Sequence, residues 1–387
     1  MSLAHGNTHS FYSPPKLQKL EQEKMKRIKI FLGGYVNYLN AQNINCRSLS
    51  EHLDQNKFNI STILHPAPNA ADFCKTTGVK YIQLRLPARF WRYLVYLKGI
   101  AFADVAYLPK GEITAFCKFI GFIFRTKLFT TIEGLLGEPS QNKKHKAYIR
   151  NFERFSPNIY SITKFLAKKE SQRHGLNISN CTLPLGVEYR FFACNPRGKE
   201  KLQNIIFIGN KLITKGIYEF LEVSTIFPEI NFHIVGKNDL GEKGSLTDYL
   251  KDGGYKNITY HGVLNHSDLS KLLPTMQLMY FPSRSEGFPK VQLEAASCGV
   301  PTLCYPDYGA DEWIDSSVNG IIVNSIEEAI EEIKKLQTDP IKLHSLSLSV
   351  VKLAQKFDWM RVIKIWESEI ANLCKNETNN LLLSTAF

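Results

Sequence analysis

Glu286 and Glu294 are two carboxylates with seven residues between them, at a point where a loop turns into a helix. Pro289 suits the first position of that helix, since its missing N–H would be unpaired there anyway. The helix is expected over Lys290–Cys298, with Gly299 as its C-cap. A helix N-terminus offers free N–H groups and a partial positive charge, which favour a phosphate. The carboxylates would repel a phosphate, so we expect them to face neutral, hydroxyl-rich parts of the same ligand. The pattern therefore predicts a nucleotide sugar, in which a diphosphate is flanked by sugars.

A lysine and two glycines stand at other junctions between strands and helices. Lys215 opens a helix soon after the strand that ends at Gly209. A lysine at a helix N-terminus opposes the helix dipole, so a bound anion explains it better than solvation alone. Gly33 and Gly34 end the first predicted strand. They form either a tight turn or a site beside the phosphates of the predicted nucleotide sugar.

Length and composition indicate a globular protein of about two domains. The chain has 387 residues, of which 44% are hydrophobic, enough to fill two cores. Its eight cysteines show no C-x-x-C spacing, so the pattern favours reduced cysteines in a cytoplasmic protein over a zinc site or a redox dithiol. Residues 1–27 are polar and contain no apolar core segment, so no signal peptide is expected.

The net charge of +12 is unevenly distributed. Residues 1–190 carry 28 Lys and Arg against 12 Asp and Glu, whereas the remainder carries 20 against 24. A basic half joined to a slightly acidic half suggests that one domain faces an anionic partner. Nucleic acid is not expected as that partner, because no nucleic-acid-binding module accompanies the charge.

Two basic stretches make an anionic membrane surface the candidate partner. Arg85–Lys98 mixes arginines with aromatic residues, and Lys143–Lys146 adds a second cluster. The first stretch is either a helix in a membrane interface or a half-buried helix with a solvated basic face. The apolar run from Ile113 to Ile132 is interrupted by charges, which argues against a membrane span. We therefore expect a cytoplasmic protein that binds peripherally to the inner face of the cell membrane.

Strand-like runs alternate with helical segments in both halves, which predicts parallel, doubly wound sheets and an α/β fold. The runs lie at residues 26–34, 60–64, 81–84, 105–108 and 128–132, and again at 204–209, 232–236, 258–262, 278–281, 302–305 and 320–323. We predict a polar extension over 1–27, a first domain over 28–186, a second over 187–355, and a helical segment over 356–387 that crosses back to the first domain.

The second half contains a series of short motifs over about residues 184–325. They are Pro184-Leu-Gly-Val-Glu188, Phe207-Ile-Gly-Asn-Lys-Leu-Ile-Thr-Lys-Gly216, His233-Ile-Val-Gly236, His261-Gly262, Phe281-Pro-Ser-Arg-Ser-Glu-Gly-Phe-Pro289, Leu293-Glu-Ala-Ala-Ser-Cys-Gly-Val-Pro301 and Asn319-Gly320. In these motifs and in their order, the second half resembles the retaining glycosyltransferases of family 4, within the glycosyl transferases group 1, which have the GT-B fold. The resemblance implies two Rossmann-like domains with parallel sheets facing a central cleft. The second domain would bind the nucleotide sugar and the first the acceptor.

The resemblance also implies roles for the matched positions. Lys215 looks like the lysine that neutralises the donor diphosphate, Glu286 like the glutamate near the donor sugar, and Glu294 like the one that accepts from ribose hydroxyls. The candidate catalytic residues are Glu286, Lys215 and Glu133. The candidate donor-binding residues are Gly33, Gly34, Gly209, Asn210, Lys211, Lys215, Gly287, Phe288, Pro289 and Glu294.

The chain departs from the family pattern at two places. Family members usually carry arginine where Asn210 stands, and the adjacent Lys211 could supply the charge, although without the bidentate fork of arginine. Many members have a histidine where this chain has Glu133, after Thr130-Thr-Ile132. Glu133 is therefore either a site residue or a carboxylate on a surface turn.

No Asp-x-Asp pair occurs in the chain, so we expect no metal requirement and no cofactor, with Lys215 and the helix N-terminus in place of an ion. The prediction is a hexosyl-type retaining transferase that moves a sugar from a UDP- or GDP-sugar to a glycan or lipid-linked hydroxyl, in the synthesis of a cell-surface polysaccharide or glycolipid. The alternatives are a GT-B epimerase or phosphorylase and a weak or inactive transferase-like binding subunit, for which Asn210 is the best support.

Overall fold

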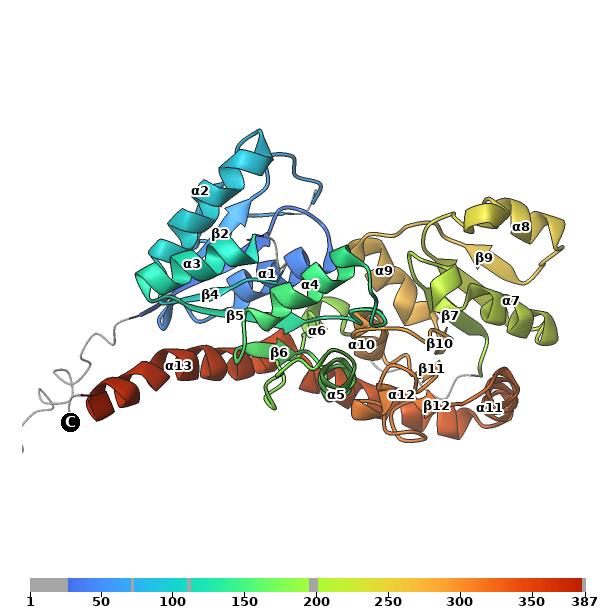
Figure 1. The fold of residues 1–387 in the computed structure, drawn as a ribbon. Coiled ribbons are helices and arrows are strands. Elements are labelled where there is room, and N and C mark those ends of the chain that lie inside the picture. Colours follow the sequence, from blue (N-terminus) through green and yellow to red (C-terminus); the bar gives the residue numbers. More distant parts are fainter. Residues whose placement is uncertain (1–26, 71–72, 110–112, 195–200, 385–387) are drawn as a thin grey trace, which may run out of the picture.

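The computed structural model describes residues 27–70, 73–109, 113–194 and 201–384, and the side chains of the last helix as far as Lys375. The predicted polar extension lies outside these residues, apart from Arg27. The described chain forms two lobes, each built around a six-stranded sheet with helices on both faces (Figure 1). The strand pairs in both sheets are parallel. The predicted α/β fold with two doubly wound sheets is confirmed.

The first lobe has the strand order β3-β2-β1-β4-β5-β6. Its strands are β1 (Ile28–Tyr35), β2 (Phe58–Leu64), β3 (Lys80–Gln83), β4 (Val105–Tyr107), β5 (Lys127–Ile132) and β6 (Ile159–Ser161), and its helices are α1 (Ala41–His52), α2 (Ala88–Ala101), α3 (Thr114–Phe124), α4 (Lys143–Glu153) and α5 (Lys164–His174). Successive side chains of a strand face opposite sides, so Ile30 and Leu32 pack under α1 and α5 whereas Phe31 packs under α2, α3 and α4. Burial of both faces explains why β1 is apolar over Ile30, Phe31 and Leu32.

The second lobe repeats this topology with the order β12-β11-β10-β7-β8-β9. Its strands are β7 (Asn204–Ile208), β8 (Asn231–Val235), β9 (Ile258–Tyr260), β10 (Leu278–Phe281), β11 (Thr302–Cys304) and β12 (Ile321–Ile322). Its α-helices are α6 (Tyr189–Phe192), α7 (Ile217–Ile226), α8 (Leu246–Asp252), α9 (His266–Leu272), α10 (Lys290–Ser297), α11 (Ile326–Thr338) and α12 (Pro340–Lys356), and its 3₁₀ turns are η1 (Ile213–Lys215), η2 (Gly241–Lys243), η3 (Leu273–Thr275) and η4 (Ala310–Glu312).

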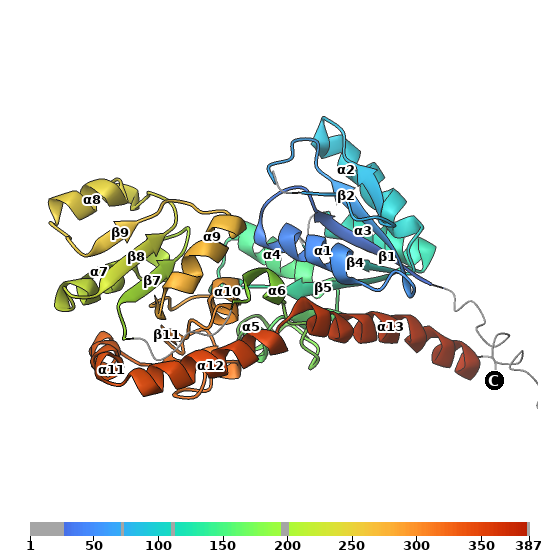
Figure 2. The ribbon, with the colours of Figure 1, turned by 180° about the vertical axis from the view of Figure 1, so that it is seen from behind.

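Two chain segments cross between the lobes side by side. The first runs through Gly186 and Val187, and the second runs from α12 through Asp358 into α13 (Trp359–Ser384). Val187 forms a parallel bridge with Asp358. α13 then lies along the first lobe, as Figure 2 shows from behind, and its buried Trp359 and Trp366 belong to the core under α1.

The predicted turn at Gly33 and Gly34 is wrong, because β1 continues to Tyr35. The two glycines instead lie at an irregularity in the pairing with β2, between Leu32 and Tyr35. A Cβ atom at Gly34 would come within 2.6 Å of the Cys46 sulfur. Gly34 therefore allows α1 to approach the sheet closely.

Among the described residues, no helix combines the length and the apolar character that crossing a bilayer requires.

Candidate functional site

Lys215 and Glu286 meet where the strand order of the second sheet reverses, between β7 and β10. Ligands of doubly wound sheets bind at the carboxyl ends of the strands at such a point. The Nζ atom of Lys215 lies 2.5 Å from Oε1 of Glu286, and the Ser283 hydroxyl donates to the same oxygen at 2.6 Å. Gly209 makes room for the lysine, because a Cβ atom there would lie 2.4 Å from Lys215 Cδ. The structure thus brings together Gly209, Lys215 and Glu286, three of the site residues predicted from the sequence.

Helix α10 begins next to this pair at Lys290, as predicted, but Pro289 precedes the first helical residue instead of occupying that position. Pro289 is the N-cap, with an extended backbone, because its carbonyl already accepts the N–H of Gln292. The helix ends at Ser297 instead of Cys298. Gly299 follows with a φ of +72°, the left-handed conformation that closes a helix C-terminus. The free N–H groups of this helix therefore start beside Glu286.

The loop before α10 touches the first lobe. A Cβ atom at Gly287 would lie 2.0 Å from the carbonyl oxygen of Glu133, so only glycine allows this approach. The next residue, Phe288, packs against Trp313 and Phe357 at ring-centroid distances of 5.0 and 5.4 Å. Its side chain is thus an anchor that fixes the loop, which leaves the backbone to face the site.

Glu133 follows β5 and is held by three neighbouring side chains. Tyr107 donates to Oε1 at 2.9 Å, Thr131 donates to the same oxygen at 3.2 Å, and Asn45 donates to Oε2 at 2.7 Å. Burial raises the pKa of Glu133, while the hydrogen bond from Tyr107 and the charge of Lys290 oppose that rise. These contacts exclude the alternative of a solvated carboxylate on a surface turn.

Lys290 is a site residue that sequence reasoning missed. It is the first residue of α10, and its Nζ atom donates to Oδ1 of Asn45 on α1 at 2.6 Å, which links the two lobes. Burial lowers the pKa of Lys290, and the charges of Glu133, Glu294 and Glu188 act in the opposite direction. Asn45 thus bridges the lysine of one lobe to the glutamate of the other.

Glu294 lies one turn further along α10 and is buried, with 7% of its surface exposed. The Nε2 atom of His266, the first residue of α9, lies 3.7 Å from its Oε1. Burial raises the pKa of Glu294, and the charges of His266 and Lys290 counteract it. A buried carboxylate that pairs with an imidazole at this distance still has oxygen lone pairs that can accept hydrogen bonds from a ligand.

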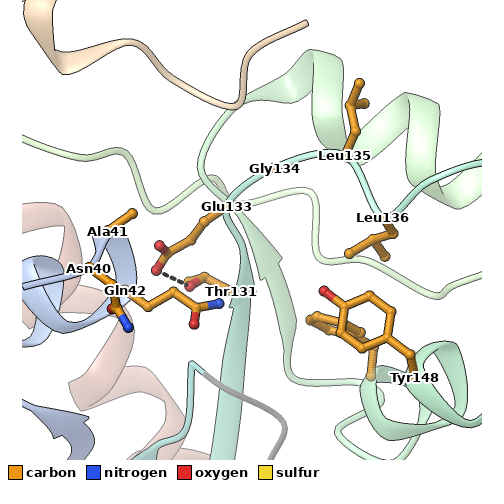
Figure 3. A pocket seen from close by; sticks show the side chains of 10 residues that line it. Asn40, Ala41, Gln42, Thr131, Glu133, Gly134, Leu135, Leu136 and Tyr148 are labelled. Carbon is orange, nitrogen blue, oxygen red and sulfur yellow. Dashed lines mark hydrogen bonds between the residues drawn. The ribbon is translucent and has the colours of Figure 1, made fainter. Parts of the chain in front are cut away.

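A pocket of about 370 Å³ lies in the first lobe beside Glu133. Figure 3 shows the polar side chains of Asn40, Gln42 and Glu133 at one side and the Tyr148 ring at the other. The wall is completed by Ala41, Thr131, Gly134, Leu135, Leu136 and Phe152. The pocket therefore offers hydroxyl-binding groups next to an apolar surface.

Four predicted donor-binding residues stand apart from these contacts. Gly33 and Gly34 lie inside β1, where packing accounts for them. Asn210 and Lys211 are exposed on the segment between β7 and η1. Within the described parts of the chain neither side chain forms a hydrogen bond with Lys215 or Glu286, although the Lys211 carbonyl accepts the backbone N–H of Lys215 at 3.2 Å.

One group of three potential metal ligands occurs among the described residues, at Glu51, His52 and Glu188, whose ligand atoms lie within 4.8 Å of one another. Glu51 pairs with Arg47 at 3.1 Å, and His52 pairs with Glu188 at 3.5 Å. Burial disfavours the charged imidazole, but the hydrogen bond and charge of Glu188 raise the pKa of His52. Ion pairing thus accounts for this group without a metal.

Residues 195–349 match the family described as Glycosyl transferases group 1. This segment is a group 1 glycosyltransferase domain. The domain holds Lys215, Glu286 and Glu294 together with α10, so the geometry described above lies within the matched region.

Curated relatives match the group 1 domain and its surroundings. An N,N'-diacetylbacillosaminyl-diphospho-undecaprenol alpha-1,3-N-acetylgalactosaminyltransferase of Campylobacter jejuni is 26% identical over 45% of this chain and 47% of that protein. An alpha-galactosylglucosyldiacylglycerol synthase of Streptococcus pneumoniae is 24% identical over 39% of this chain and 41% of that protein. The chain spans about half the length, or less, of the curated relatives it matches.

Solved structures resemble both lobes. A glycosyltransferase from Rickettsia africae superposes with a TM-score of 0.73 at 13% identity, over 91% of this chain and 100% of that one. The Anabaena protein HepE, crystallised with UDP and glucose, gives a TM-score of 0.70 at 15% identity over 89% and 100%. At these identities the likeness shows the fold alone. That fold is GT-B, as the resemblance in the sequence predicted.

Proposed function

We propose that this protein is a retaining glycosyltransferase of family 4 that uses a nucleotide-sugar donor. The observation that carries the proposal is the pair of Lys215 and Glu286 at the strand switch point of the group 1 domain, next to the N-terminus of α10. We also propose domain boundaries near residues 186 and 355, with the donor in the second domain and the acceptor in the first.

The leaving group would be the nucleoside diphosphate, which gains negative charge as the glycosidic bond breaks. Lys215 and the N–H groups at the start of α10 are placed to stabilise that charge, and electrostatic stabilisation of this kind is usually the largest contribution to catalysis. The acceptor hydroxyl would attack the anomeric carbon on the face from which the diphosphate departs. Since these groups replace an ion on the diphosphate, the proposed reaction needs no metal.

Glu286 and Glu294 would hold the uncharged parts of the donor. Glu286 uses one carboxylate oxygen for Lys215 and Ser283, which leaves the other for the donor sugar. Glu294 would accept from the ribose hydroxyls. HepE binds UDP and glucose, which supports a UDP-hexose as the first donor to test, with a GDP-sugar as the other candidate.

The acceptor would enter the pocket beside Glu133, where hydroxyl-binding and apolar groups adjoin. Two relatives are named for lipid-linked products, an undecaprenol diphosphate and a diacylglycerol. They support a glycan or lipid-linked acceptor at the cytoplasmic face of a membrane, in polysaccharide or glycolipid synthesis. The basic first half of the chain fits that location.

Nucleotide binding tests the donor site directly. We expect UDP or GDP, or a sugar conjugate of one of them, to raise the melting temperature, since ligand at a hundred times its Kd stabilises by about 2.7 kcal/mol. Lys215→Ala should abolish the shift, whereas Lys251→Ala, a matched change at an exposed lysine of the second lobe, should keep most of it. Thermal-shift assays of the three proteins provide the measurement, and no shift with any nucleotide would contradict the proposal.

Transfer is tested separately from binding. Glu286→Gln should keep the nucleotide shift and lose about 10²–10³-fold in turnover, as expected for a group that acts on the transition state. NMR of the product gives the anomeric configuration, and inversion would refute the proposed retention. Rearranged sugar nucleotide without acceptor would instead identify an epimerase.

A non-catalytic binding subunit is the second candidate, because an exposed Asn210 stands where the family has arginine. If the protein is such a subunit, Glu286→Gln should leave any measured rate of sugar transfer unchanged.

A further inference from the structure

Helices α2 and α3 pack side by side and expose large apolar side chains. Phe90 on α2 is 65% exposed, and Phe119 and Phe122 on α3 are 62% and 83% exposed. Further exposed apolar residues on these helices are Tyr93, Leu94, Ile123 and Phe124. Isolated apolar residues on a surface are ordinary, but a contiguous group of this kind marks an interaction surface. We call these seven residues the α2–α3 face.

The α2–α3 face is separate from the core of the lobe. Each helix buries its opposite side against the first sheet, through Val95 and Ile100 on α2 and Cys117 and Ile120 on α3. Tyr93 makes an edge-on ring contact with Phe116 at 5.0 Å, which joins the two helices. The face lies on the side of the first lobe away from the second sheet (Figures 1 and 2).

Basic residues surround the α2–α3 face. From Arg85 to Lys127 the sequence contains eight Lys and Arg against two acidic residues, Asp104 and Glu112. The Asp104 carboxylate accepts from the backbone N–H of Lys29 and is therefore used inside the lobe. Arg89 and Lys118 are exposed beside the aromatic residues. Two copies of this face would bring like charges together, which argues against a homodimer and for an anionic partner.

The chemistry of the face fits a bilayer surface. Aromatic side chains favour the boundary between headgroups and acyl chains, and nearby arginines and lysines attract anionic headgroups. Neither helix is long enough to span the hydrocarbon layer, since α2 has 14 residues and α3 has 11. Helices of this kind lie in the plane of the interface. α4, which lines the pocket beside Glu133, packs on the same face of the first sheet.

We propose that the α2–α3 face docks this protein on an anionic lipid bilayer. Phe90, Phe119 and Phe122 enter the interfacial layer, while Arg89 and Lys118 contact phosphate groups. The inference does not depend on glycosyl transfer, because the face lies outside the donor site. It locates the contact on α2 and α3, whereas the sequence singled out the basic stretch that includes α2 and the cluster at Lys143–Lys146, but not α3.

Sedimentation of the full chain with vesicles tests this docking. Vesicles of phosphatidylglycerol and phosphatidylcholine should carry the protein down at low salt, and pure phosphatidylcholine vesicles should carry much less. Phe119→Ser/Phe122→Ser should weaken binding about tenfold or more through loss of apolar insertion. Arg89→Glu/Lys118→Glu should weaken it about fivefold for each basic residue lost and remove much of its salt dependence.

Matched changes on the second lobe serve as controls. Ile341→Ser/Leu348→Ser removes two exposed apolar residues of α12, and Lys251→Glu/Lys256→Glu reverses two exposed lysines. Both should bind vesicles like the parent protein, and unchanged nucleotide shifts would show that every variant is folded. Equal binding of the Phe119/Phe122 variant and the parent would overturn the proposal. So would a parent dimer that this variant dissociates, since the face would then join two protein copies.

Discussion

Glu133, Lys290 and Glu294 are three ionisable side chains that lie largely out of water between the lobes. Burial shifts the pKa of each toward its neutral form, upward for the two glutamates and downward for the lysine. The Tyr107 hydrogen bond at Glu133 and the charge of His266 at Glu294 oppose these upward shifts, and the charge of Lys290 adds to the opposition at both carboxyls. Removal of one member would therefore leave a buried charge without compensation, which costs far more than loss of a surface ion pair.

The raised pKa of Glu294 predicts two pH effects of opposite sign. The folded protein holds this proton more tightly than the unfolded chain, so the free energy of unfolding falls as pH rises from the usual 4.5 through the folded pKa. Nucleotide affinity should rise over the same interval, because ribose hydroxyls need an ionised acceptor. We expect Glu294→Gln to flatten both profiles, measured by denaturant unfolding and by titration calorimetry. Affinity that falls with rising pH would exclude Glu294 as the ribose contact.

The sequence predicted the members of the site that belong to a continuous motif. Glu286 and Glu294 frame a loop and a helix whose turn chemistry can be recognised locally, and Lys215 opposes a helix dipole. Lys290 lies within the same motif but gave no such signal, because its partner Asn45 is 245 positions earlier. A lysine on the first turn of a helix is normally solvated, and only the packing of the lobes removes it from water.

At the scale of elements, α10 joins the donor site to the first lobe through Lys290 and Asn45. Lys290→Met keeps the length of the side chain but leaves polar partners unsatisfied, so we expect a loss of roughly 1–3 kcal/mol in the free energy of unfolding. Lys335→Met, which breaks an exposed pair with Glu332 at 2.7 Å, should change the free energy of unfolding far less, because surface ion pairs contribute little. Denaturant unfolding measures both.

Asn45→Ala completes a double-mutant cycle with Lys290→Met. Residues in contact should show a coupling of about 0.5–3 kcal/mol. Additive effects of the two substitutions would mean that the link between the lobes contributes nothing.

Strands buried on both faces were predictable because they are short apolar runs bounded by glycine or polar residues. β6 was missed, since it has only three residues and follows Pro157 and Asn158, which indicate a turn. Gly33 and Gly34 were assigned to a turn because glycine favours turns. Their actual reason is close packing, of Leu108 against Gly33 and of Cys46 from α1 against Gly34, and these are tertiary contacts that no local pattern contains.

For the whole molecule, the decisive element is α13, which belongs to the first lobe although it is the last helix. Trp359 and Trp366 are fully buried there, and the Trp366 indole N–H donates to the Pro184 carbonyl at 2.9 Å. Loss of one such side chain costs about 3–5 kcal/mol, which is a large share of a typical stability of about 5–15 kcal/mol. The first lobe therefore depends on the end of the chain.

A chain that ends after Phe357 should lose the tertiary structure of the first lobe and keep that of the second. Near-ultraviolet circular dichroism and calorimetry would show one remaining transition. A chain that ends after Lys375, which keeps every described side chain of α13, should unfold like the parent. Two undiminished transitions in the shorter chain would show that α13 is dispensable.

The return of α13 also sets an order in time during synthesis. The first sheet is complete once β6 has been synthesised, but the helix that covers one face of it, α13, begins at Trp359, roughly 200 residues later. At 5–20 residues per second, translation leaves the apolar rings of Tyr107 and Phe129 uncovered for roughly 10–40 s. The lobe that leaves the ribosome first is thus the last to close. Chaperone supply and translation rate should therefore govern its yield more than that of the second lobe.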